Sequence, residues 1–103
     1  METIDKQDNN KITSVLRKNG IVFAAIFGSR AKGTAILGSD YDFLIEFSPS
    51  YKIPLSRFLP LKESIEKVVK NDVDIITIGG LGKKKFKQEV LSTMKVLYDE
   101  RKK

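Results

Sequence analysis

The sequence contains no cysteine and no histidine among its 103 residues. Without cysteine the chain has no disulfide bonds and no thiolate metal sites, and this absence favours an intracellular, cytoplasmic location. Without histidine, structural zinc sites and every Ser-His or Cys-His catalytic pair are excluded as well. The chemistry that remains is that of carboxylates, hydroxyl groups, lysine and arginine.

The sequence also lacks any hydrophobic run as long as a membrane span. Its first ten residues are polar and of mixed charge, unlike the basic and then apolar start of a secretory signal. With 41% hydrophobic and 9% aromatic residues, the composition is that of an ordinary globular chain. We therefore expect one folded domain, residues 1–103, and no membrane partner.

Positive charge is concentrated towards the C-terminus. The net charge is +6, and residues 82–103 contain eight Lys or Arg against three Asp or Glu. Such a segment attracts polyanions or an acidic partner, although a solvated helix face has the same composition. Direct nucleic-acid binding stays an alternative that we do not favour, because no aromatic platform is interleaved with the lysines.

Hydrophobic periodicity predicts three strands and three longer helices. The strands are expected at residues 21–27, 41–47 and 73–78, and the helices at residues up to about 19, 59–70 and 83–99. The first and third strands are continuous apolar runs, which is typical of strands that are covered on both faces. The element order implies an α/β fold of the α+β type, with helices packed on a small mixed sheet.

Two details of the helices can be checked against a structure. Pro60 suits the first turn of the helix at 59–70, which follows an irregular turn from Pro54. The buried stripe of this helix is expected to be Leu61, Ile65, Val68 and Val69. The stripe of the last helix is expected to be Phe86, Val90, Leu91, Met94, Leu97 and Tyr98.

Carboxylates stand at the beginning of one predicted strand and inside another. Asp40 and Asp42 are two residues apart, so an extended chain places both side chains on one face. Close carboxylates repel unless protons, basic partners or a divalent metal offset the repulsion. Asp74 lies between Val73 and Ile75, where burial without a partner is costly. Since only hard oxygen ligands are present, the natural ion is Mg²⁺ or Mn²⁺.

A Gly-Ser pair follows the first predicted strand, ten residues before Asp40. We expect Ser29 to be the N-cap of a short helical turn through Ala31. Free backbone N–H groups at such a turn bind phosphate, Gly28 allows close approach and the Ser29 hydroxyl adds a donor. The spacing of Gly28 and Gly33 matches a P-loop, but the Lys-Ser/Thr that a P-loop requires is missing.

The pattern of Gly-Ser, ten residues, Asp-Tyr-Asp and a later VDIIT resembles the minimal nucleotidyltransferases of the DNA-polymerase-β superfamily. The resemblance covers residues 12–100, and EVLSTMKVLYDE is similar to the last helix of that family. It implies a polymerase-β-like minimal nucleotidyltransferase fold. It also implies an enzyme that transfers a nucleotide from a nucleoside triphosphate and releases pyrophosphate.

The resemblance further implies roles for the three acids. Asp40 and Asp42 would bridge two Mg²⁺ ions, while Asp74 would ligate the catalytic ion and help to deprotonate the acceptor hydroxyl. In two-metal chemistry one ion lowers the pKa of the acceptor and the other neutralises the triphosphate.

Four further residues are implied to bind the nucleotide. Gly28 and Ser29 would hold the β- and γ-phosphates of the triphosphate. Arg30 and Lys32 would contact phosphate or a partner, with a solvated position on the helical turn as the alternative.

A chain of this size resembles the free-standing minimal members of the family, which are antitoxins paired with helical HEPN proteins. The implied function is transfer of AMP from ATP to a tyrosine hydroxyl of a HEPN RNase toxin. One alternative is a non-catalytic antitoxin that neutralises its partner by binding. Another is a basic RNA-binding module that uses residues 83–87.

Overall fold

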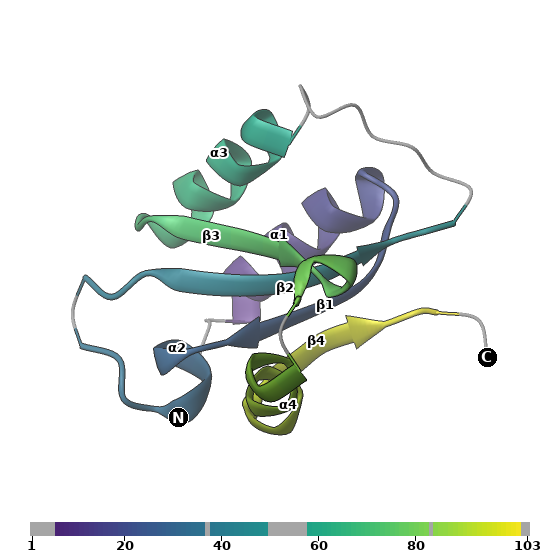
Figure 1. Ribbon diagram of the computed structural model, residues 1–103. Helices are drawn as coiled ribbons and strands as arrows, with labels where there is room; N and C mark the ends of the chain where they lie inside the picture. The colour runs from purple at the N-terminus through teal and green to yellow at the C-terminus, as the bar shows by residue number, and fades with distance from the viewer. Residues whose placement is uncertain (1–5, 37, 50–57, 83, 102–103) are drawn as a thin grey trace.

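The computed structural model describes residues 6–36, 38–49, 58–82 and 84–101, and its core is a four-stranded mixed sheet with helices on both faces (Figure 1). The elements in chain order are α1 (Lys6–Lys18), β1 (Ile21–Phe27), α2 (Ser29–Lys32), β2 (Tyr41–Phe47), α3 (Phe58–Val69), β3 (Val73–Thr77), the 3₁₀ turn η2 (Ile78–Gly80), α4 (Lys84–Thr93) and β4 (Lys95–Asp99). The predicted fold class is confirmed. No helix in the described residues has the length and apolar character needed to cross a membrane.

The strands lie in the order β3-β2-β1-β4. Strand β1 is antiparallel to both β2 and β4, whereas β2 and β3 are parallel and are connected through α3. The register aligns Asp42 with Phe27 on one side and with Asp74 on the other. The parallel pair therefore places acids from two separate parts of the sequence next to each other.

The apolar side chains form one core on each face of the sheet. Helices α1 and α3 cover the first face, where Ile12, Leu16 and Ile65 are fully buried. Helix α4 and the segment around η2 cover the second face through Val90 and Leu81. Residues of β1 alternate between the two cores, so the prediction of a strand covered on both faces is confirmed.

Helices α1 and α3 agree with their predictions. Helix α1 ends at Lys18, and Gly20 takes the left-handed conformation that stops it, with φ of 75°. Helix α3 has Pro60 in its first turn, buries Leu61 and Ile65, and packs the two valines near its end against the core. The turn expected from Pro54 lies outside the described residues.

The prediction of one long helix at residues 83–99 is wrong. Helix α4 ends at Thr93, and residues 95–99 form the edge strand β4 against β1. The buried Tyr98 donates a hydrogen bond to the Ile21 carbonyl (2.6 Å), which fixes this pairing. In the expected stripe Val90 is buried, but Phe86 and Leu91 are 43% and 40% exposed.

The prediction that the third strand is covered on both faces is confirmed only in part, since Ile75 and Ile76 pack against the two cores but Asp74 is exposed. Strand β3 lies at the other edge of the sheet and ends at Thr77. Val73 is buried in the first core, but Asp74, on the opposite face, is exposed. Asp74 therefore does not carry the free-energy cost of a buried charge. Any role of this acid has to be inferred from the residues beside it.

Candidate active site

The Gly-Ser pair lies at the sharp turn from β1 into the short helix α2. Gly28, with φ of 75° and ψ of −153°, is the N-cap of α2, and its carbonyl accepts hydrogen bonds from the N–H groups of Ala31 and Lys32. That backbone conformation is essentially restricted to glycine. The prediction that Ser29 is the N-cap is wrong, because Ser29 is already the first helical residue and no side chain caps the helix.

Gly28 packs directly on the carboxylate of Asp42. A Cβ atom added at position 28 would overlap Oδ2 of Asp42. The missing side chain thus serves two purposes, since it permits the backbone conformation and leaves room for the acid. The structure brings the two halves of the sequence motif into contact at this point.

The three predicted acids are neighbours at the start of β2 and β3. Asp42 is half-buried and in register with Asp74, whereas Asp40 and Asp74 are exposed. Burial raises the pKa of the Asp42 carboxyl above its ordinary value, and the carboxylates of Asp74 and Asp40 raise it further. The repulsion predicted between Asp40 and Asp42 is thus present, and Asp74 adds to it.

The donor chemistry of this cluster suits a hard divalent cation. No three acidic side chains within the described ranges already surround a point as a metal site would require. Mg²⁺ is commonly held by one or two carboxylates together with waters and substrate phosphates, so it does not need a closed protein cage. The residues therefore fit a cation that binds together with a phosphate ligand.

Arg30 and Lys32 belong to the same short helix but contact different residues. The guanidinium of Arg30 donates to the Ser39 carbonyl (Nη2–O 2.7 Å) and stacks over the Tyr41 ring at 4.2 Å. Lys32 makes an ion pair with Glu89 of α4 (2.7 Å), and this contact lowers the pKa of Glu89. Contact of either residue with phosphate stays a prediction.

Helix α4 also approaches the end of β1 through an aromatic contact that sequence reasoning missed. The rings of Phe27 and Phe86 meet edge to face, with centroids 6.4 Å apart. Phe86 was expected on the buried stripe of a long helix, and nothing in the local pattern indicates that its ring meets Phe27. Tyr41 was missed as well, although alternation along the strand places its side chain on the face opposite to Asp40 and Asp42, which was a usable signal.

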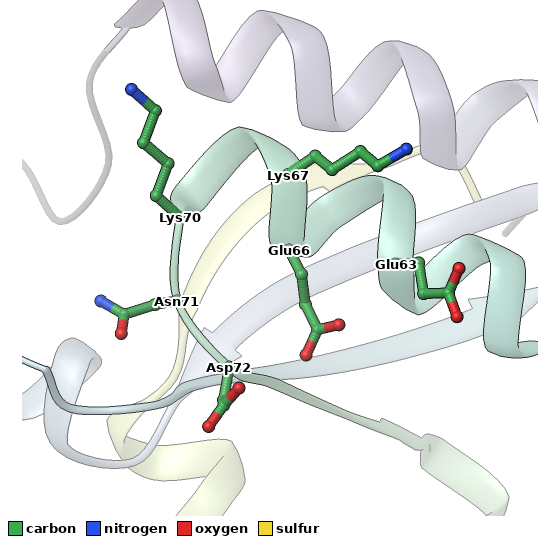
Figure 2. A pocket seen from close by; sticks show the side chains of 6 residues that line it. All are labelled: Glu63, Glu66, Lys67, Lys70, Asn71 and Asp72. Carbon is green, nitrogen blue, oxygen red and sulfur yellow. The ribbon is translucent and has the colours of Figure 1, made fainter.

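A separate hollow lies at the C-terminal end of α3 (Figure 2). It has a volume of ≈ 500 Å³ and is lined by Glu63, Glu66, Lys67, Lys70, Asn71 and Asp72. The backbone carbonyl of Asp72 accepts the N–H of Tyr41. None of the predicted site residues lines this hollow, so it is distinct from the acid cluster.

The family of the chain follows from its similarity to known proteins. Residues 10–103 match the family model described as "Polymerase beta, Nucleotidyltransferase". The chain belongs to this family and is a nucleotidyltransferase. It is 35% identical over 71 residues, 69% of this chain and 74% of the relative, to the Methanocaldococcus jannaschii protein named "Putative protein adenylyltransferase MJ0435". A second protein of that organism with the same type of name is 33% identical over 76 residues, 66% of this chain and 76% of the relative.

Solved structures share the fold. One described as a minimal nucleotidyltransferase has a TM-score of 0.72 and 28% identity over 87% of this chain and 89% of its own. A toxin-antitoxin structure with AMP-PNP has a TM-score of 0.72 and 24% identity over 88% and 73%. A Shewanella oneidensis complex of a tri-AMPylated HEPN toxin with an MNT antitoxin has a TM-score of 0.67 and 19% identity over 93% and 73%. The polymerase-β-like minimal nucleotidyltransferase fold is confirmed.

Proposed function

We propose that this nucleotidyltransferase transfers AMP from ATP to a tyrosine hydroxyl of a HEPN toxin, and so acts as the antitoxin of the pair. The proposal is supported by the relatives named as protein adenylyltransferases and by the HEPN complexes of the structural neighbours. The observation that carries it is the direct packing of Gly28 on Asp42, with Asp74 in register beside them. A loop suited to phosphate thus adjoins a cluster of carboxylates.

In this reaction the predicted site residues have different roles. The Gly28 backbone and the Ser29 hydroxyl bind the β- and γ-phosphates, while Arg30 and Lys32 stay as predicted contacts to phosphate or partner. Asp40 and Asp42 would hold two Mg²⁺ ions, for which Mn²⁺ could substitute, and Asp74 would be a further ligand of the catalytic ion. When bound, the ions neutralise the triphosphate and lower the pKa of the acceptor hydroxyl.

The reaction forms one P–O bond and breaks another. The acceptor oxygen attacks the α-phosphorus of ATP, and the bond from that phosphorus to the bridging oxygen of the β-phosphate breaks to release pyrophosphate. Asp74, which is exposed, takes up the proton of the acceptor hydroxyl. Its exposure suits this role, because the acceptor belongs to a separate protein and must reach it from outside.

The test is incubation of the purified chain with the candidate HEPN partner, Mg²⁺ and labelled ATP, CTP, GTP or UTP. We expect AMP to be added only from ATP and onto a tyrosine, as measured by intact mass and peptide mapping. The Asp42→Asn variant is the control and should add no label. A tight complex without any transfer from the four nucleotides would favour neutralisation by binding alone, and retained RNA binding by a variant without the three acids would favour the RNA-binding alternative.

A further inference from the structure

Ten residues separate the Gly28-Ser29 pair from Asp40, and the side chain of Arg30, the first of the ten, reaches Ser39, the last. Its Nη2 donates to the carbonyl of Ser39 at 2.7 Å, and its guanidinium carbon lies 4.2 Å from the centre of the Tyr41 ring. Ser39 and Tyr41 are the two chain neighbours of Asp40. One arginine of helix α2 thus contacts both the residue before Asp40 and the residue after it.

The aromatic partner of Arg30 is itself anchored in the core. The Tyr41 ring stacks on Phe43 with centroids 6.5 Å apart, and Phe43 is fully buried. The backbone N–H of Tyr41 donates to the Asp72 carbonyl at 3.0 Å, which ties the start of β2 to the start of β3. Arg30 therefore stacks on a ring that is itself packed against the core of the sheet.

The carbonyl partner of Arg30 is fixed from the other side. The N–H of Ser39 donates to the Ile36 carbonyl (3.0 Å), and the N–H of Ile36 donates to the Ser39 hydroxyl oxygen (2.9 Å). These two bonds tie Ser39 to Ile36, and the Ser39 carbonyl accepts the hydrogen bond from the guanidinium. A planar group with donors along its edge can bond this carbonyl and stack on the ring at once, whereas an ammonium group cannot do both.

The Asp40 carboxylate has no such support of its own. It is exposed, and in the part of the chain that the structure describes no hydrogen bond or ion pair holds it directly. Its direction thus depends on the backbone of residues 39–41. We propose that Arg30 is a positioning residue, which holds the backbone on both sides of Asp40 and so sets the direction of its carboxylate, which would share a cation with Asp42. The inference rests on the proposed function, because it assigns Asp40 to a cation.

The experiment compares Arg30→Lys, Tyr41→Leu and Tyr41→Phe with the wild type, in complex with the HEPN partner. Arg17→Lys is the matched control, because Arg17 stacks in the same way on Tyr98 (4.5 Å) at the opposite end of β1. Two quantities are measured, namely the steady-state rate of nucleotide transfer and the affinity for Mn²⁺ alone by electron paramagnetic resonance. Thermal unfolding confirms that each variant is folded.

We expect Arg30→Lys and Tyr41→Leu each to lower kcat about 10- to 100-fold, since small displacements of reacting groups cost about that much. The KM for ATP should change less than about threefold. Mn²⁺ should bind more weakly, as is also expected for Asp40→Asn, which is titrated alongside. The double variant should be little worse than either single one, because both remove the same support. Tyr41→Phe keeps the ring and should resemble the wild type, as should Arg17→Lys.

Two results would overturn the inference. If Arg30→Lys raises KM for ATP and leaves kcat and Mn²⁺ affinity unchanged, Arg30 is a nucleotide contact. If Asp40→Asn weakens Mn²⁺ binding but Arg30→Lys and Tyr41→Leu do not, Arg30 does not position the acid. The proposed function fails in a different way, namely when no nucleotide is transferred by the wild type, and the Mn²⁺ titration still tests the inference in that case.

Discussion

The two ends of β1 are built from similar parts but differ in how their charges are paired. At the Ile21 end, Arg17 stacks on Tyr98 and pairs with Glu100, while the Tyr98 hydroxyl is bonded to a backbone carbonyl. At the Phe27 end an arginine again stacks on a tyrosine, but three acids face one another beside Gly28. The first end is arranged for stability, whereas the second keeps repulsion that a cation with a phosphate ligand would relieve.

The comparison is tested most severely by Asp42→Asn. We expect nucleotide transfer to fall about 1,000-fold or more, or about 4 kcal/mol of barrier, because an acid assigned to the cations is lost. In EDTA the same variant should unfold at a higher temperature than the wild type. A carboxyl whose folded pKa is raised contributes its full stabilisation below the ordinary value of 3.8, and this stabilisation is lost as the pH rises through the raised pKa, so it is absent at pH 7.

The matched change at the other end is Glu100→Gln, which removes an exposed ion pair with Arg17. It should leave transfer unchanged and should not raise the unfolding temperature in EDTA. A drop in the unfolding temperature of Asp42→Asn in EDTA would contradict the view that this end carries unrelieved repulsion. Scanning calorimetry at pH 7 with and without EDTA measures both variants.

Gly28→Ala should have the next largest effect. The essentially glycine-only conformation costs about 1–3 kcal/mol of stability for alanine. The new Cβ also displaces the Asp42 carboxylate, so transfer should fall about 100-fold.

Gly33→Ala separates the effect of the backbone conformation from that of the contact with Asp42, because Gly33 has a similar φ of 76° but open space around its Cβ position. It should cost about 1 kcal/mol in denaturant unfolding and leave most of the transfer rate. Equal rates for the two variants would show that the contact with Asp42 is not needed.

Much of this arrangement could be predicted from the sequence, because it depends on local patterns. The strands at residues 21–27 and 41–47, the helix at 59–70 and the pair of acids two residues apart are all consequences of periodicity and turn chemistry. The Gly-Ser spacing led to the correct family. In each of these cases the neighbours that decide the structure are close in sequence.

The features that were missed depend on residues far apart in the chain. Residues 95–99 fit a helical period, and only pairing with β1 and the Tyr98 hydrogen bond make them a strand. Asp74 is exposed because β3 is an edge strand, and strand order cannot be read from the apolar run itself. The direction of the Arg30 side chain depends on the position of the Ser39 carbonyl, nine residues further along the chain.

The smallest effect on activity is expected for Tyr98→Phe, which alters only the stable end of β1. The buried Ile21 carbonyl loses its donor, so the free energy of unfolding should fall by about 1–2 kcal/mol while transfer stays within about twofold of the wild type. Burial raises the pKa of Tyr98 from 10.0 to about 12. The stabilisation is therefore complete below pH 10 and is lost as the pH rises through about 12, because the unfolded tyrosine ionises first. Urea unfolding from pH 8 to pH 12 should show the two proteins converging over this window, and a constant difference across it would mean that the hydroxyl does not hold β4 on β1.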